Sequence, residues 1–226
     1  PTPAVAPVIS GNTIQARRTG IFHNLHYSAA SAYSLSNNTI TGLADVNETG
    51  VRGILLSSLS VPSTSSGNTI DMSGVTAPTS GYEVWNVKAT SAAAITGGSV
   101  SGAATGLFLN NFEGYSSNAG DGAHATVSGL AITCPAAGTG IRVLDSTSSS
   151  THAAVSVAIG SGVSVTGGSR GLVVENAAAS VGGVSDLSLS GQTGNFIELI
   201  QNSGDIDATA VRFNNKIGSA MNLGEL

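Results

Sequence analysis

Apolar and polar residues alternate over short segments along the whole chain, and turns rich in Gly, Ser and Asn separate these segments. Alternation with a period of two residues predicts β-strands, because successive side chains of a strand point to opposite faces. One motif, GNTIQ at 11–15, returns as SNNTITG at 36–42 and as GNTIDMSG at 67–74. We align its inward aliphatic residue, at intervals of 24 to 33 residues, at Ile14, Ile40, Ile70, Val100, Leu130, Val163, Leu187 and Val211.

A second series of predicted strands begins with a glycine that is followed by an apolar residue. We align its copies at Gly20-Ile21, Gly50-Val51, Gly81-Tyr82, Gly106-Leu107, Gly140-Ile141 and Gly171-Leu172. The seventh copy, Gly194-Asn195-Phe196, is looser. Because an inward glutamate is costly, we expect a slip of one residue there, which places Glu198 outward and Ile197 and Leu199 inward. A third, weaker series lies between the first two, at Tyr33–Leu35, Ala93–Ile95, Ala125–Val127, Val155–Ile159 and Ala179–Val181.

Three short strands per repeat predict an all-β fold, a right-handed single-stranded parallel β-helix (solenoid) of about seven to eight rungs. Strands this short cannot bury a face alone, so each rung must pack on its neighbours. The competing architecture is a β-sandwich, which does not require similar residues to stack at a fixed period. We expect residues 1–8 to be a proline-rich lead and 9–226 a single β-helix domain, a fragment of a chain that continues beyond Leu226.

Stacking gives each position of the glycine-led strand a direction. Counting from the glycine, positions one and three point inward, and alternation sends position five inward as well. Position five is polar on consecutive rungs, and a buried carboxamide must be hydrogen-bonded. We therefore predict a structural ladder at a turn, formed by Asn86, Asn111, Asp145 and Asn176.

Positions two and four of the same strands point outward and supply the candidate binding strip, Arg52, Glu83, Trp85, Phe108, Asn110, Arg142 and Glu175. Arg52 and Glu83 are expected to stack directly on neighbouring rungs. Arg142 and Glu175 are expected to meet diagonally as an ion pair. An exposed strip of aromatic and polar residues can bind a sugar or a protein partner. Alternatively, long loops fold over it, and the candidates are 112–127 and 144–154.

Composition narrows the range of partners. Charged residues make up 9% of the chain, the net charge is −5, and the basic residues are scattered, which excludes a basic stripe for nucleic acid or anionic lipid. No apolar run approaches the ~20 residues of a membrane helix, so no direct membrane insertion is expected. The single cysteine, Cys134, excludes an internal disulfide and a cysteine-based metal site.

The acidic residues are dispersed and form no cluster suited to cleaving a polysaccharide. Glycoside hydrolysis needs two carboxylates facing one bond, and lyase chemistry needs a base and usually calcium. Asp205 and Asp207 share one strand face but are interpreted as solvated, and His23 and His26 are expected on opposite faces. We therefore assign no catalytic residue, no metal and no cofactor.

Four segments carry a resemblance to a known family: NTITG (38–42), TGIRVLD (139–145), RGLVVEN (170–176) and DATAVRFNN (207–215). With them the chain resembles the bacterial right-handed parallel β-helix repeat proteins, the pectin-lyase-like superfamily in the broad sense. The resemblance implies the fold, which hosts many activities. The charge-poor, Ser/Thr/Ala-rich style looks most like passenger domains and repeat regions of secreted or surface-displayed proteins. The acidic clusters of the superfamily's lyases and polygalacturonases have no counterpart here.

The resulting expectation is a non-catalytic, extracellular structural or adhesive β-helix segment of a bacterial surface or secreted protein. Its expected partner is a polysaccharide or another cell-surface protein. The alternative is a carbohydrate-binding or carbohydrate-active protein, a polysaccharide lyase or glycoside hydrolase, that uses the outer strand face.

Overall fold

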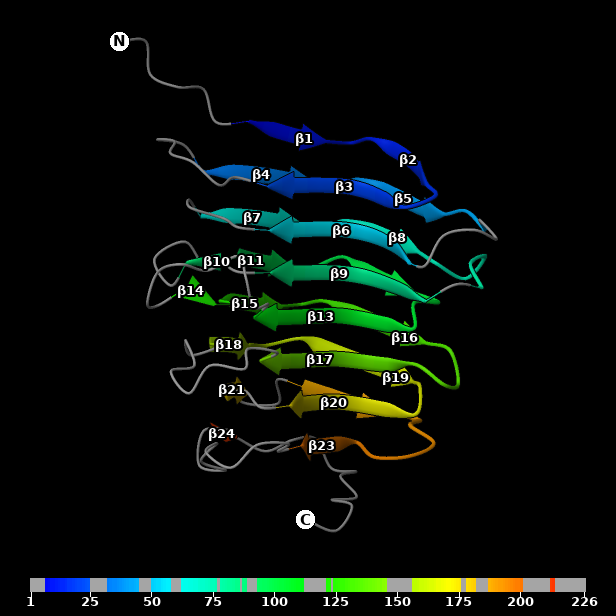
Figure 1. Ribbon diagram of the computed structural model, residues 1–226, viewed down its shortest axis with the longest axis vertical. Coiled ribbons are helices and arrows are strands. Elements are labelled where there is room, and N and C mark those ends of the chain that lie inside the picture. Colours follow the sequence, from blue (N-terminus) through cyan, green and yellow to red (C-terminus); the bar gives the residue numbers. More distant parts are fainter. Residues whose placement is uncertain are drawn as a thin grey trace.

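The computed structural model describes the residues 7–24, 32–44, 50–57, 62–76, 78–85, 87–88, 93–111, 121–122, 124–145, 156–175, 178–181, 187–200 and 212–213. Throughout these ranges the regular structure is β, arranged in three long parallel sheets (Figure 1). A two-stranded antiparallel pair is added at one side, formed by β10 (Val87–Lys88) and β14 (Asp121–Gly122).

Each sheet takes one strand from every turn of the chain. The first sheet has eight strands: β1 (Val8–Ser10), β4 (Tyr33–Ser36), β7 (Ser63–Ser66), β11 (Ala93–Thr96), β15 (Ala125–Ser128), β18 (Ser156–Ile159), β21 (Ala178–Val181) and β24 (Arg212–Phe213). The second has seven: β2 (Thr13–Ala16), β5 (Thr39–Gly42), β8 (Thr69–Asp71), β12 (Ser99–Ser101), β16 (Ala131–Cys134), β19 (Val163–Gly167) and β22 (Leu187–Ser190). The third also has seven: β3 (Thr19–Asn24), β6 (Val51–Ser57), β9 (Thr79–Trp85), β13 (Thr105–Asn111), β17 (Thr139–Asp145), β20 (Arg170–Glu175) and β23 (Ile197–Ile200).

The chain therefore coils as a β-solenoid with three strands per turn, as the sequence predicts. We number the turns along the chain, so that turn one is β1–β3 and turn seven is β21–β23. In Figure 1 the third-sheet strands run leftward at the front, the first-sheet strands run rightward behind them, and the chain descends. This path is a right-handed coil, the hand that parallel crossover connections almost always take.

The interior is filled by columns of stacked side chains, and one of these columns belongs to the second sheet. Paired positions on successive strands are Ile14, Ile40, Ile70, Val100, Ile132, Val165 and Leu189. The first four members agree with the sequence alignment. Leu130, Val163 and Leu187 do not belong to this column, because each lies two residues before its true member, and Val211 lies outside the described residues.

The glycines that lead the third sheet have a steric cause. A Cβ on Gly106 would lie 2.3 Å from Ile132 Cγ2 and 2.7 Å from the Gly140 carbonyl oxygen, so no side chain fits. The same crowding, by the next aliphatic residue of the second sheet and the next backbone carbonyl, holds at Gly20, Gly53, Gly81, Gly140 and Gly171.

The second member of this glycine column is Gly53, so the predicted pair Gly50-Val51 is wrong. Ile21 pairs with Ile54, and a Cβ on Gly53 would lie 2.6 Å from Ile70 Cγ2, whereas a Cβ on Gly50 would meet nothing closer than 3.6 Å. At the seventh strand the predicted slip is confirmed. Leu172 pairs with Ile197 and Val173 with Glu198.

Candidate functional site

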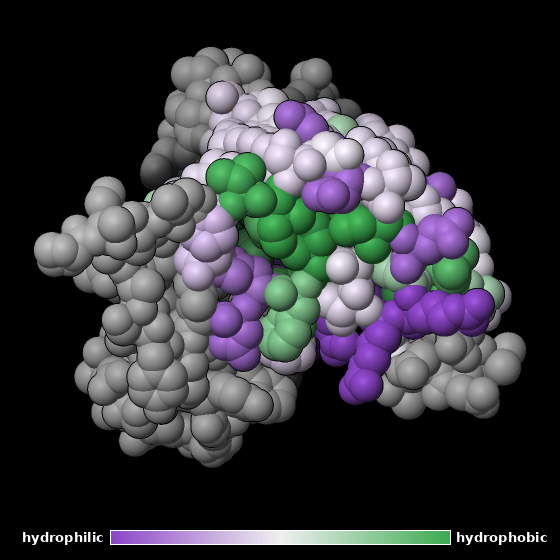
Figure 2. Space-filling view, turned by 90° about the horizontal axis from the view of Figure 1, so that it is seen from above, coloured by the Kyte–Doolittle hydropathy of each residue, from purple (hydrophilic) through white to green (hydrophobic). Residues whose placement is uncertain are grey.

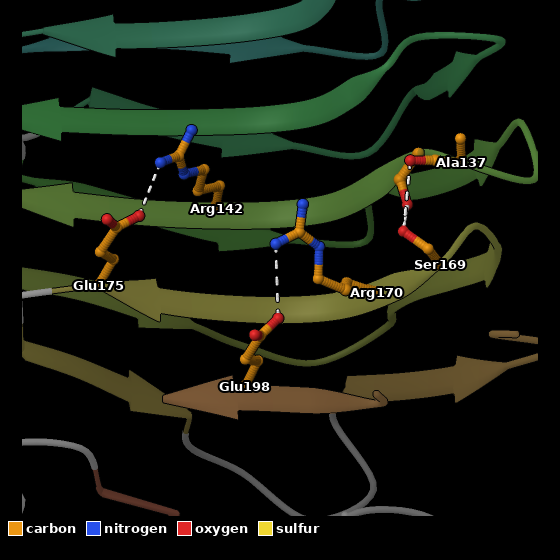
Figure 3. Close-up of polar contacts among 7 residues, drawn as sticks. Ala137, Arg142, Ser169, Arg170, Glu175 and Glu198 are labelled. Atoms are coloured by element: carbon orange, nitrogen blue, oxygen red, sulfur yellow. Dashed lines mark hydrogen bonds and ion pairs between the residues drawn. The ribbon is translucent and has the colours of Figure 1, made fainter. Parts of the chain in front are cut away.

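Ion pairs run diagonally across the outer face of the third sheet. Arg142 Nη2 donates to Glu175 Oε2 at 2.6 Å, as predicted, and Arg170 Nη1 donates to Glu198 Oε2 at 3.5 Å (Figure 3). In turns two and three, Arg52 Nε donates to Glu83 Oε2 at 2.6 Å. Each pair joins neighbouring strands, so the charges hold successive turns in register.

Arg52 and Glu83 meet, but not by the direct stacking that the sequence alignment predicted. Leu55 and Phe108 stand beside Glu83 on the adjacent strands, while Arg52 pairs with Ser80. Arg52 precedes the column glycine Gly53, and its long side chain reaches diagonally to the carboxylate.

Two of these arginines also cover an aromatic ring. The Arg52 guanidinium carbon lies 5.3 Å from the centroid of the Trp85 ring, and that of Arg142 lies 5.4 Å from the Phe108 ring. Both distances suit a cation–π contact. We call the first group (Arg52, Glu83, Trp85) the Arg52 cluster. The second (Arg142, Glu175, Phe108) is the Arg142 cluster, and both contain only residues of the predicted strip.

The two clusters differ in exposure. The side chains of Arg52 and Glu83 are 27% and 6% exposed, whereas those of Arg142 and Glu175 are 39% and 16% exposed. Asn110, which also belongs to the predicted strip, is buried. The predicted strip is therefore interrupted by buried members and is not one continuous open surface. The loops predicted to cover it lie largely outside the described residues.

The structure shows an asparagine ladder at the opening motif, where the sequence analysis did not place one. The backbone N–H and Nδ2 of Asn12 donate to Asn38 Oδ1 at 3.1 and 2.9 Å. Asn38 repeats this toward Asn68 Oδ1, at 2.9 Å for both bonds. Of the ladder predicted from the sequence, Asn86, Asn176 and the side chains of Asn111 and Asp145 lie outside the described residues, although Asn111 and Asp145 do pair along the backbone.

The ladder ends inside the core at turn three. Asn68 Nδ2 shares its two protons among three acceptors, Leu35 O at 3.0 Å, Ser65 Oγ at 2.9 Å and the Tyr82 hydroxyl at 3.3 Å. Ser65 Oγ donates to the same hydroxyl. Ser65 is smaller than its column neighbours Leu35 and Ile95, and Tyr82 fills the space with its ring and hydroxyl. Burial raises the pKa of Tyr82, so it stays neutral and can serve as both donor and acceptor.

Beyond turn three the same column changes its chemistry. The next position is Gly98, where a Cβ would lie 2.3 Å from Asn68 O. The following positions are Leu130, Val163 and Leu187, all at most 2% exposed. These three aliphatic residues thus occupy the asparagine column, which is why aligning them with Ile14 gave an error of two residues.

The sequence analysis missed a groove at the corner between the second and third sheets. The connections β8–β9 and β16–β17 are longer than the connection β12–β13 that lies between them. The groove forms over the short connection and has a volume of about 560 Å³. Hydroxyl and small apolar side chains line it: Ser73, Val75, Thr76, Thr79, Ser101, Gly102, Ala104, Thr133, Cys134 and Pro135. Unequal spacing between the second-sheet and third-sheet motifs is the signal that could have indicated it.

Titratable groups near this groove are in unreactive states. Hydrogen bonds from the Ser73 side chain and backbone and from the Ser101 hydroxyl lower the pKa of Asp71, which keeps it charged. Burial raises the pKa of the Cys134 thiol to about 11, so the nucleophilic thiolate is scarce near neutral pH.

His23 is the other buried titratable group. It is 8% exposed, its ring centroid lies 4.1 Å from that of Tyr33, and burial lowers its pKa. It occupies the inward column of Leu56, so it serves as a core residue at the first turn. His26 lies outside the described residues. Within the ranges that the structure describes, no three His, Cys, Asp or Glu residues gather as a metal site.

Comparison with known proteins gives no match: no family model, no curated protein sequence and no solved structure matches the chain. Over its described ranges the chain forms no helix of the length and apolarity needed to cross a bilayer. The geometry therefore has to support a function by itself.

Proposed function

We propose that this chain is a non-catalytic structural segment, a rigid β-helical spacer of an extracellular protein. The observation that carries the proposal is the pairing of the outer-face carboxylates. Glu83, Glu175 and Glu198 each contact an arginine of the preceding strand of the third sheet. These ion pairs connect one turn to the next, and contacts between neighbouring turns are what stabilise a solenoid.

The same pairing speaks against glycoside hydrolysis on this face. That reaction needs two carboxylates directed at one glycosidic bond, about 5–10 Å apart. Here each carboxylate is directed at a guanidinium, and the Arg52 and Arg142 guanidinium groups also cover the aromatic rings. Sugar-binding sites commonly use such rings as flat contact surfaces, so the covering arginine has to move before Trp85 or Phe108 can serve in that way.

Composition supports an extracellular site of action. The chain has only 9% charged residues and one cysteine, and its polarity comes from Ser, Thr, Asn and Gly. We propose a bacterial surface or secreted protein of the pectin-lyase-like, passenger-type class, from the resemblance of its repeat segments. Its proposed partner is a polysaccharide or another cell-surface protein, bound beside the rod or at its ends.

The proposal is tested by an assay for product formation, together with a measurement of carbohydrate binding on a glycan array. Purified protein is incubated with polygalacturonate and with alginate, and both reducing ends and unsaturated products are followed. We expect no product above that of a heat-denatured sample. Product that disappears in Glu83→Gln but persists in the control Glu198→Gln would refute the proposal. Glycan-array binding without turnover that is lost in Phe108→Ala would assign a carbohydrate-binding role instead.

A further inference from the structure

The N-terminal end of the solenoid has the character of an interior surface. β1, β2 and β3 are the edge strands of their sheets within the described ranges. Figure 2 looks onto this end and shows apolar side chains gathered across it. Ile9 is 39% exposed and Ile14 is only partly buried, whereas their partners one turn below, Leu35 and Ile40, are 1% and 0% exposed.

The asparagine ladder has a direction, and this direction defines what each turn offers its neighbours. The upper asparagine gives its backbone N–H and Nδ2 to the Oδ1 of the asparagine one turn below. The lower asparagine returns an Nδ2 proton to a first-sheet carbonyl of the turn above. Asn38 uses Ile9 O and Asn68 uses Leu35 O, which are paired positions. Every interior step of the ladder therefore makes three hydrogen bonds.

Asn12 lacks the upper half of this set. Among the described residues nothing donates to its Oδ1, and its Nδ2 turns to Ser10 O of its own turn at 3.1 Å. Asn12 Oδ1 and Asn12 Nδ2 both lie at the edge, where a further turn would supply two donors to Oδ1 and a carbonyl acceptor to Nδ2. A turn placed above this edge also needs a glycine above Gly20. At each glycine of the third-sheet column, a Cβ would collide with the carbonyl oxygen of the residue one turn below it, as a Cβ on Gly20 would with Gly53 O.

Residues 1–6 are fewer than the residues of one turn. Six residues extend over about 20 Å, which is one strand and not a turn of 24 to 33 residues.

We propose that the N-terminal edge is a docking surface for one further parallel β-helical turn, which carries an asparagine above Asn12 and a glycine above Gly20. Such a turn gives its backbone N–H and Nδ2 to Asn12 Oδ1 and a first-sheet carbonyl to Asn12 Nδ2. Its aliphatic side chains cover Ile9 and Ile14. This proposal does not depend on the proposed function, because the hydrogen-bonding groups of the N-terminal edge are the same in a spacer and in an enzyme.

A second copy of this chain docked by its C-terminal end is a poorer match. The last described strand of the second sheet is β22, and it places Leu187 in the ladder column. A leucine side chain has no donor for Asn12 Oδ1 and would leave a buried acceptor unsatisfied.

The experiment adds the missing turn to the full chain. A copy of residues 33–62 is placed directly before Pro7, in place of residues 1–6, because Pro7 stands in the register position of Tyr33 and Ser63. The copied Asn38 and Gly53 then lie above Asn12 and Gly20. The matched control carries Asn38→Leu in the copied segment only, and both extended chains are also made with Asn12→Ala.

Amide hydrogen exchange of residues 8–24 is the measurement. We expect the asparagine extension to slow exchange at this edge by about tenfold or more relative to the leucine extension, because the leucine leaves hydrogen bonds unmade. We also expect Asn12→Ala to abolish that difference. Equal protection by the two extensions, or a difference that survives Asn12→Ala, would overturn the proposal. So would concentration-dependent self-association of the unextended chain that Asn12→Ala abolishes, since the occupant would then be a second copy.

Discussion

Turns one to three and turns five to seven fill the same interior column with opposite chemistry. In the first region the column is Asn12, Asn38 and Asn68, joined by hydrogen bonds from turn to turn. In the second it is Leu130, Val163 and Leu187, all buried. Gly98 separates the two regions, at a point where the Asn68 carbonyl leaves no room for a side chain.

The difference shows that the backbone coil does not need one particular side chain at this corner. It needs the corner to be filled and the polar groups there to be paired. Carboxamides do this with directional bonds that also fix the register between turns. Aliphatic residues do it by volume alone, and their register depends on the glycine column and the ion pairs of the third sheet.

The largest effect is expected where the two regions are alike. Gly53→Ala and Gly140→Ala should each lower the free energy of unfolding by at least about 3 kcal/mol, because a Cβ in either place meets a backbone carbonyl at 2.6 Å and a core methyl at 2.6 or 2.3 Å. Urea unfolding measures the loss. The matched control is Gly50→Ala, which we expect to change stability by less than about 1 kcal/mol. A similar loss in all three variants would mean that Gly53 is not the column member.

The next effect distinguishes the regions. Asn38→Leu copies the chemistry of turn five into turn two, and it should cost about 2–4 kcal/mol. It removes the acceptor of two Asn12 donors and the Nδ2 that reaches Ile9 O and Asn68 Oδ1. Leu130→Met changes shape at the apolar end of the column and should cost less than about 1.5 kcal/mol. If equilibrium unfolding finds Asn38→Leu neutral or stabilising, the ladder contributes nothing beyond filling space.

A smaller contrast is expected between the two clusters of the outer face. Arg52→Met leaves Glu83 buried without its guanidinium, and it should cost about 2–3 kcal/mol. Arg142→Met affects a pair with an arginine that is 39% exposed, and it should cost less than about 1 kcal/mol. Thermal unfolding of both variants at low and high salt tests the order. Equal losses would show that the burial of Glu83 does not matter for stability.

The smallest effect concerns pH and the first turn alone. Burial lowers the pKa of His23 below its ordinary value of 6.5, so the unfolded chain takes up the proton first as pH falls. The contribution of His23 is complete above pH 6.5, and it decreases below that value until the lowered folded pKa is reached. The slope is at most about 1.4 kcal/mol per pH unit. His23→Leu should remove this part of the pH dependence, and an unchanged profile would show that the pKa of His23 does not differ between the folded and the unfolded chain.

The fold could be predicted from the sequence because alternating apolar and polar residues and strand-leading glycines return at similar intervals along the chain. The third strand series was found in turns two, four, five, six and seven, where it is apolar. It was missed at β7, Ser63–Ser66, where the inward residue is the polar Ser65, hydrogen-bonded to the Tyr82 hydroxyl, and at β1, Val8–Ser10, whose first residue was assigned to the proline-rich lead. Gly50 and Gly53 could not be told apart by sequence, because only the contact with Ile70 distinguishes them.

The site was predicted in part for a similar reason. The residues of the strip were placed on one outer face, and the diagonal pair of Arg142 and Glu175 was anticipated from the register. The burial of Glu83 and Asn110 was not, because it depends on contacts that alternation does not encode. The ladder was sought among asparagines at a constant distance from the glycine. The ladder that the structure describes lies at the GNTI motif, where aliphatic residues replace asparagine from turn five onward and hid the column.

Side-chain hydrogen exchange of the asparagines, measured by NMR, tests the central claim of a hydrogen-bonded column that ends at turn three. The Nδ2 protons of Asn38 and Asn68 are both donated within the core, whereas Asn12 is exposed at the edge. We predict exchange at Asn38 and Asn68 at least about tenfold slower than at Asn12. Exchange of all three at the rate of a solvent-exposed carboxamide would contradict the ladder.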